Sequence, residues 1–147
     1  MANLYLFDID KTLLINSSDK SYAKPIRNLY AINVDDAQDF SGMTDKLILA
    51  KLLRAEGWPE PRIAANMPAL ISELGRVHAE DFRSSYVTII PGAEELLDAL
   101  QAGGHTLGLV TGNLKVIAER KLEAAHICQR FAVGAYGDDI QIGRAHV

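Results

Sequence analysis

The sequence has a single cysteine, Cys128, and no long apolar run. One cysteine excludes an internal disulfide, and an apolar run shorter than about 18 residues excludes a membrane-spanning helix. The first residues lack the basic segment followed by an apolar one that a secretory signal requires. We therefore expect a cytoplasmic protein without disulfides or membrane segments, in which Cys128 is a small buried apolar residue rather than a nucleophile.

Neither sign of charge is in large excess. The chain carries 15 basic and 19 acidic residues, which gives a formal net charge of −4 at pH 7. A mildly acidic protein gains nothing from general attraction to nucleic acid or to an anionic membrane, so neither is expected as a partner. A phosphorylated ligand would need a local cation or a metal ion.

The 147 residues suffice for one compact domain, or for a domain with a small insertion. Hydrophobic periodicity and turn residues predict alternating elements along the chain. The predicted strands are 4–7 (a fully buried one), 106–110 and 131–136, and the predicted helices are 19–32 with Asp19 as N-cap, 44–57 with Thr44 as N-cap, 62–84, 94–102 and 114–125.

Alternating helices and strands after residue 91 predict a parallel α/β sheet with right-handed crossovers. The helices between the first two strands are too many for one crossover. We therefore expect an incomplete Rossmann-like core of residues 1–14 and 89–140, with residues 15–88 inserted as a helical subdomain. Residues 141–147 resemble a translated sequencing adapter, so we expect the natural sequence to end near Ile140.

Two acidic residues, Asp8 and Asp10, follow directly after the first predicted strand. In open α/β sheets, ligands bind beyond the carboxyl ends of the strands. Residues two apart in extended chain point the same way, and two carboxylates in one pocket repel each other unless a cation lies between them. Mg²⁺ prefers such oxygen ligands. Turn residues alone would be the alternative interpretation, but the apolar run before the pair favours a functional site.

Thr111, Gly112 and Asn113 lie where the second core strand meets a helix. A hydroxyl, backbone N–H groups and a side-chain amide can bind a phosphate at such a helix start. Taken alone, the tripeptide is an ordinary turn in which Asn113 caps the helix. Its position one core strand after the acidic pair favours phosphate binding, because the two strands can lie side by side.

These motifs resemble those of the haloacid-dehalogenase-like hydrolases. The segment from Phe7 to Leu14 (FDIDKTLL) resembles the first motif of that family, although Lys11 stands where glycine is commoner, and the segment from Leu109 to Asn113 (LVTGN) resembles the second. The insertion is similar to the helical cap of the family, and the segment from Phe40 to Asp45 (FSGMTD) is similar to a cap segment of phosphoglycolate-phosphatase-like members.

The resemblance implies a magnesium-dependent phosphatase acting on a small phosphorylated metabolite such as phosphoglycolate. Asp8 would attack phosphorus and form a phospho-aspartate, while Asp10 would act as general acid and base. Asp8 and the main-chain carbonyl of Asp10 would bind Mg²⁺. The phosphate would contact Thr12, Thr111, Gly112 and Asn113, and Gly42, Thr44 and Asp45 of the cap would contact the substrate.

The family also uses a basic residue and an acidic pair that completes the magnesium site. We expect the third strand to lie outside the second, away from Asp8, so Asp138 and Asp139 are not expected to bind the metal. Lys115 and Lys121 are expected to be surface lysines. The chain would therefore be truncated and have little activity. A phosphotransferase or mutase of the same superfamily, and a non-catalytic phosphate-binding fragment, are the alternatives.

Overall fold

The computed structural model describes residues 1–17 and 20–139. The predicted N-cap at Asp19 and the tail at 141–147 lie outside the described residues. Contacts divide the chain into two compact units. The first, here called the core unit, comprises residues 1–17, 82–111 and 115–136, and the second, here called the helical unit, comprises residues 20–81, 112–114 and 137–139.

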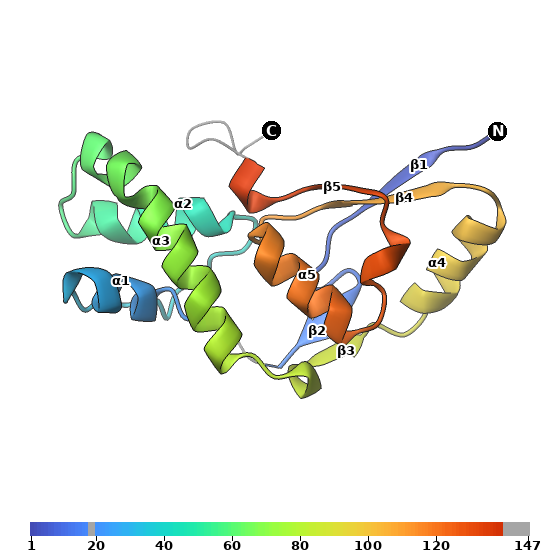
Figure 1. Ribbon diagram of the computed structural model, residues 1–147, viewed down its shortest axis with the longest axis horizontal. Helices are drawn as coiled ribbons and strands as arrows, with labels where there is room; N and C mark the ends of the chain where they lie inside the picture. Colours follow the sequence, from blue (N-terminus) through green and yellow to red (C-terminus); the bar gives the residue numbers. More distant parts are fainter. Residues whose placement is uncertain (18–19, 140–147) are drawn as a thin grey trace. The chain divides into compact units, whose positions relative to one another are not determined.

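The core unit is built on a parallel sheet of three strands in the order β1-β4-β5 (Figure 1). The predicted α/β class with a parallel sheet is therefore confirmed. Its elements are β1 (Leu4–Phe7), β2 (Leu14–Asn16), the 3-10 helix η1 (Ser84–Tyr86), β3 (Val87–Ile89), α4 (Ala93–Ala102), β4 (Thr106–Val110), α5 (Lys115–Ala124), the 3-10 helix η2 (Cys128–Arg130) and β5 (Val133–Ala135).

The register of the sheet brings the carboxyl ends of β1 and β4 together, since Phe7 pairs with Leu109. Gly108 in turn pairs with Val133, which places β5 on the side of β4 that faces away from β1. Both placements agree with the predicted topology. The residues that follow β1 and β4 therefore leave the sheet at the same edge, where ligands bind in open α/β sheets.

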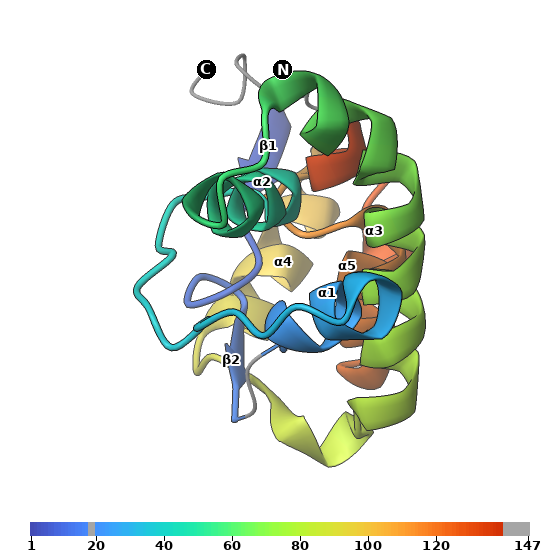
Figure 2. The same cartoon turned by 90° about the vertical axis from the view of Figure 1, so that its left-hand side faces the viewer.

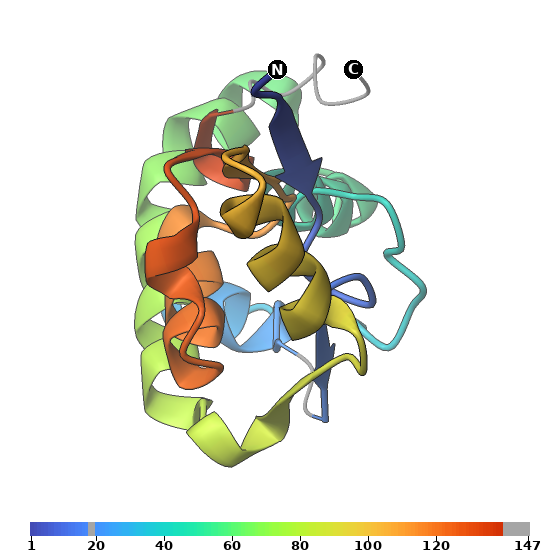
Figure 3. The ribbon, with the colours of Figure 1, turned by 90° about the vertical axis from the view of Figure 1, so that its right-hand side faces the viewer.

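One face of the sheet is covered by helices and the other is exposed. Leu107 and Leu109 of β4 share a buried cluster with Leu97 of α4 and Leu122 of α5, so both helices pack against that face (Figure 3). The opposite face carries four exposed apolar side chains, namely Leu4, Leu6, Val110 and Val133. The prediction that residues 4–7 form a fully buried strand is thus wrong, because β1 is an edge strand and one of its faces is exposed to solvent.

A second, antiparallel pair of strands lies outside the main sheet. Leu14 of β2 pairs with Ile89 of β3, and Asn16 pairs with Val87. Leu14 is fully buried in the core cluster. This pair was not predicted, because each strand has only three residues and carries too little alternation to be recognised.

The helical unit contains three helices and a short turn of 3-10 helix. They are α1 (Ala23–Tyr30), α2 (Asp45–Ala55), α3 (Glu60–Asp81) and η3 (Gly137–Asp139). Helix α3 packs against both α1 and α2 (Figure 2). The side chain of Thr44 accepts a hydrogen bond from the Leu47 N–H, so the predicted N-cap of α2 is confirmed.

In the part of the chain that the structure describes, no helix is long and apolar enough to cross a membrane.

Candidate active site

The loop after β1 is folded tightly around the backbone of Ile9. The Ile9 carbonyl accepts hydrogen bonds from the N–H groups of Leu13 (2.9 Å) and Leu14 (3.1 Å), and the side chains of all three residues are buried. Lys11 completes the turn with φ of 62°, a left-handed conformation that favours glycine. The buried side chains on both sides of Asp10 hold its backbone in a defined position.

Asp8 is the first residue after β1, and its carboxylate is held by the backbone of the next residue, Ile9. Its Oδ1 accepts a hydrogen bond from the Ile9 N–H at 2.8 Å. Although the residue reaches solvent, partial desolvation raises the pKa of the Asp8 carboxyl above its ordinary value, and the negative charge of Asp10 adds to this rise. The Ile9 N–H and the ammonium group of Lys121 act in the opposite direction.

Asp10 forms an ion pair with a buried lysine. The Lys121 Nζ lies 2.9 Å from Oδ1 and 3.2 Å from Oδ2 of Asp10. The Lys121 side chain is 2% exposed and that of Asp10 is 43% exposed. Lys121 was predicted to be a surface lysine without a role near the acidic pair, and this prediction is wrong. A buried ammonium group needs a partner, and Asp10 supplies one.

The sequence did contain a signal for the burial of Lys121. On α5 the buried residues are Ile117, Ala118, Lys121 and Leu122, so the lysine lies on the apolar face of the helix. A charged residue at an inward helical position is unusual and calls for a partner in the interior. Lys115, which lies on the same helix, is 62% exposed, so it is a surface lysine as predicted.

Thr111 directly follows β4, at the edge of the sheet where Asp8 directly follows β1. It is 3% exposed, and its N–H donates to the Ala135 carbonyl of β5 at 3.0 Å. The core unit therefore brings Asp8, Asp10 and Thr111 to one edge of the sheet. Thr12 follows in the same loop with an exposed side chain, and its N–H donates to the Ile9 carbonyl at 3.2 Å.

The next residues of the predicted phosphate-binding motif, Gly112 and Asn113, belong to the helical unit. There the Gly112 carbonyl accepts a hydrogen bond from the Asp45 N–H at 2.9 Å, and the Asn113 side chain is buried. Thr44 and Asp45 are buried as well, whereas Gly42 is exposed with φ of 77°. Direct contact of Gly42, Thr44 and Asp45 with a substrate stays a prediction.

Asp138 and Asp139 lie in η3 of the helical unit. The Asp138 carbonyl accepts a hydrogen bond from the Lys46 Nζ at 2.6 Å, and the Gly137 N–H donates to the Asn113 carbonyl at 2.8 Å. These bonds attach η3 to α2 and to the turn that contains Asn113, and they give this short acidic segment a structural role.

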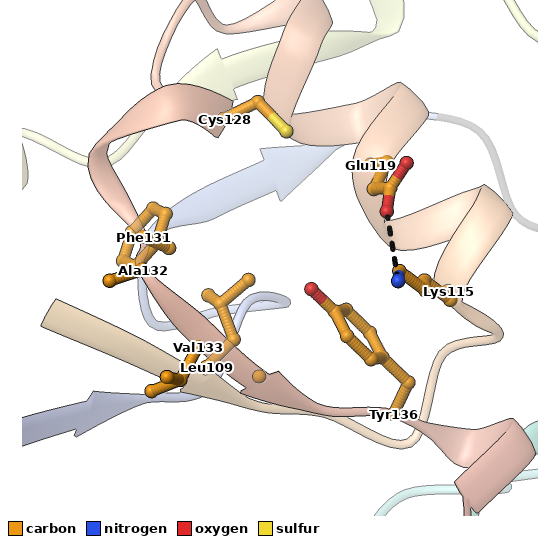
Figure 4. Close-up of a pocket in the computed structure, with 9 residues that line it drawn as sticks. Leu109, Lys115, Glu119, Cys128, Phe131, Ala132, Val133 and Tyr136 are labelled. Atoms are coloured by element: carbon orange, nitrogen blue, oxygen red, sulfur yellow. Dashed lines mark ion pairs between the residues drawn. The ribbon is translucent and has the colours of Figure 1, made fainter.

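A pocket of about 250 Å³ lies between α5, η2 and β5, and neither Asp8 nor Asp10 lines it. Figure 4 shows Lys115, Glu119 and Tyr136 among the residues that line it, and Lys115 and Glu119 form an ion pair at 3.9 Å. Cys128 also lines this pocket, and burial raises the pKa of its thiol, as do the nearby glutamates. A raised pKa lowers the thiolate fraction, which argues against a nucleophilic role.

The acidic pair has the chemistry of a weak site for a hard cation. Within residues 1–17 and 20–139, no group of three or more His, Cys, Asp or Glu residues is placed so that it could hold a metal ion. Mg²⁺ is nevertheless often held by only one or two carboxylates together with a phosphate and waters. The charge of Asp10 raises the pKa of Asp8, which is a repulsion that a bound cation would relieve.

Three solved structures illustrate what the chain resembles in fold. The protein CbbY from Rhodobacter sphaeroides, in complex with phosphate, has a TM-score of 0.61 at 22% identity, and a variant of it with xylulose-(1,5)-bisphosphate has 0.59 at 22%. A predicted phosphoglycolate phosphatase from Haemophilus somnus has 0.57 at 19%. They cover 94%, 94% and 95% of this chain, which spans only 64%, 64% and 63% of their own lengths.

No curated protein matches the chain in sequence. The model of one protein family, described as haloacid dehalogenase-like hydrolase, matches residues 5–144. This match covers nearly the whole chain and agrees with the resemblance of the two motifs and with the parallel sheet. The chain therefore belongs to the haloacid dehalogenase-like hydrolase family.

Proposed function

We propose that this chain carries the nucleophile and the acid–base residue of a phosphomonoester hydrolase that acts through a phospho-aspartate. The observation that carries the proposal is the ion pair between Asp10 and the buried Lys121. Asp10 lies two residues after Asp8, at the carboxyl end of β1. A buried lysine directed at one carboxylate of a closely spaced pair is costly for stability, and such groups gather at sites of catalysis.

In the first step an Asp8 carboxylate oxygen attacks phosphorus and the bond from phosphorus to the substrate oxygen breaks. Asp10 enters this step protonated, rather than as the carboxylate that pairs with Lys121 in the free chain, and it gives its proton to the leaving alkoxide, which departs as an alcohol. In the second step water attacks phosphorus and Asp10 takes up its proton, while the bond between phosphorus and Asp8 breaks. Inorganic phosphate leaves, and both carboxyl groups return to their starting states.

Lys121 would balance charge in these steps. Each step places a negatively charged phosphoryl group beside two acidic residues, and an ammonium 2.9 Å from Asp10 offsets part of that charge. Because Lys121 is buried on α5, its position is fixed by the packing of the helix rather than by a flexible surface rotamer.

Asp8 and the main-chain carbonyl of Asp10 would hold Mg²⁺, and Thr111, Gly112, Asn113 and Thr12 would bind phosphoryl oxygens. The bound ion would offset the charge of the phosphoryl oxygens. We further propose that the insertion of residues 15–88, of which residues 20–81 belong to the helical unit, acts as a cap that selects a small phosphorylated metabolite. The phosphate and the xylulose-(1,5)-bisphosphate bound by a neighbouring fold support this substrate class, of which phosphoglycolate is one member.

The proposal is tested by trapping the nucleophile. Beryllium fluoride added with Mg²⁺ should give a bound ¹⁹F NMR signal for the wild-type chain, and the signal should be absent for Asp8→Asn. Asp98→Asn, an exposed change on α4, serves as the matched control and should keep the signal. A bound signal of equal size in Asp8→Asn would contradict the assignment of the nucleophile.

Hydrolysis and transfer are separated by their products. With para-nitrophenyl phosphate and an added alcohol acceptor, a hydrolase releases inorganic phosphate, whereas a phosphotransferase or mutase forms a new phosphate ester. Formation of the ester as the main product would favour the transferase alternative within the same superfamily.

A further inference from the structure

A buried network of charged and polar side chains surrounds the turn of residues 112–114. The Lys20 Nζ donates to Asp45 Oδ1 at 2.7 Å and to Asn113 Oδ1 at 2.5 Å. The Tyr22 hydroxyl also donates to Asp45 Oδ1, at 2.7 Å, and the Leu114 N–H donates to Asp45 Oδ2 at 2.8 Å. All five residues belong to the helical unit.

The carboxylate of Asp45 is the centre of this network. The side chain is 2% exposed, and both of its oxygens accept hydrogen bonds. A buried carboxylate is tolerated only when it is paired, and the Lys20 ammonium supplies that pairing. The N–H of Asp45 also donates to the Gly112 carbonyl, so Asp45 holds the turn at both of its ends, Gly112 and Leu114.

Lys20 in addition fixes which way the Asn113 amide is turned. An ammonium group donates hydrogen bonds and cannot accept them, so the atom of Asn113 that faces Lys20 has to be the amide oxygen. The NH₂ group of Asn113 is then directed to the other side. An asparagine held in this way turns its donor group, and not its acceptor, away from Lys20, an orientation that suits an anionic, oxygen-rich ligand.

We propose that Lys20 and Asp45 are positioning residues for the turn of residues 112–114, and that they set Asn113 as a donor toward a phosphoryl oxygen. The second part rests on the proposed function, because it takes the ligand to be a phosphate group. The first part concerns only the hydrogen bonds of the helical unit. In this arrangement Asp45 acts on the ligand through Asn113 and Leu114 rather than by touching it.

Two readouts on the full chain test the two parts separately. Hydrogen exchange of the Leu114 amide reports the position of the turn, and an NMR titration with inorganic phosphate reports ligand binding. The variants are Lys20→Met, Asp45→Asn and the double variant that combines them. The double variant leaves no unpaired charge in the buried network, so we expect it to keep the fold. Lys24→Met is the matched control, since it removes the same charge from an exposed pair with Asp81 in the same unit.

We expect each network variant to exchange the Leu114 amide faster than wild type. Lys20→Met and the double variant should bind phosphate about tenfold more weakly, the loss expected for one oriented charge-assisted hydrogen bond. Lys24→Met should behave as wild type in both readouts. Unchanged exchange of the Leu114 amide in the double variant would overturn the positioning role.

Wild-type phosphate affinity in Lys20→Met would overturn the role of Lys20 in orienting Asn113. If the wild-type chain does not bind phosphate, the proposed function and the donor role of Asn113 fail together. The exchange of the Leu114 amide then still decides whether Lys20 and Asp45 position the turn.

Discussion

Lys121 acts on Asp8 through space, although it forms its ion pair with Asp10. Its positive charge lowers the pKa of Asp8 against the desolvation that raises it. We therefore predict that Lys121→Met raises the pKa of Asp8 further, as measured by ¹³C NMR titration of the carboxyl carbon. Lys115→Met, on the exposed side of the same helix, should leave that pKa unchanged.

Lys121→Met should weaken the trapping of beryllium fluoride while changing the stability of the fold little. Methionine fills the buried site of Lys121, and Asp10 is solvated enough to tolerate the loss of its partner. The free energy of unfolding in urea should change by no more than about 1 kcal/mol. Trapping of beryllium fluoride should weaken by about tenfold or more. Equal trapping by Lys121→Met and wild type would contradict the role of Lys121 at the site.

Asp8 should cost the fold some stability at neutral pH. Because its pKa is raised in the folded state, the ionised carboxylate is disfavoured there relative to the unfolded chain. Asp8→Asn keeps an oxygen that can accept the Ile9 N–H and removes the charge, so it should increase the free energy of unfolding at pH 7. Because Asp8 is exposed, the gain should stay below about 1 kcal/mol.

The gain in free energy of unfolding from Asp8→Asn should decrease as the pH falls. It is present in full above the folded-state pKa of Asp8 and shrinks as the pH falls through that value. It vanishes below the ordinary value of 3.8, where Asp8 is protonated in both states. Urea unfolding of both proteins at several pH values measures it, and a gain that grows toward low pH would contradict the raised pKa.

Among the elements, β4 is the one that organises the core unit, and Gly108 lies at its centre. A Cβ placed on Gly108 would lie 2.8 Å from side-chain atoms of both Leu6 and Val133. Because glycine has no side chain, the side chains of Leu6 and Val133 on the neighbouring strands can lie over β4 at this position. Gly108→Ala should lower the free energy of unfolding by about 1–3 kcal/mol, because the side chains above it have to move.

Thr106→Ala, an exposed change on the same strand, is the control for the Gly108 substitution. It should cost less than about 1 kcal/mol, the range of strand propensities. If urea unfolding gave equal losses for the two variants, the close packing over Gly108 would not be the cause.

At the scale of the core unit, one face of the sheet exposes several apolar side chains to solvent. Leu4, Leu6 and Val133 are 54%, 55% and 51% exposed, and the side chains of Leu6 and Val133 both lie over Gly108. Val110, 47% exposed, follows on the same face of β4. Exposed apolar side chains gathered on one face of a sheet favour association.

We predict concentration-dependent self-association of the chain, measured by sedimentation velocity. Val110→Thr should weaken it, since threonine suits a strand and adds a hydroxyl to the apolar surface. Val116→Thr is the matched control, because Val116 is also 47% exposed but lies on α5. Equal weakening by both variants would show that the sheet face is not the contact surface.

Several features followed from the sequence because they depend on neighbours along the chain. The N-cap at Thr44, helix α3 and strand β4 are all set by residues within a few positions of one another. The same holds for the acidic pair at the end of β1. Strand order followed as well, since a right-handed crossover through one helix leaves β5 little choice of place.

The tertiary structure alone decided which side chains meet. Lys121 lies 111 positions from Asp10, and Lys20 lies 93 positions from Asn113, so periodicity along the chain could not pair them. The exposure of β1 depended likewise on which strands pair with it, not on its own four apolar residues. Local patterns fix elements because backbone geometry is local, whereas burial and charge pairing are decided by residues that only folding brings together.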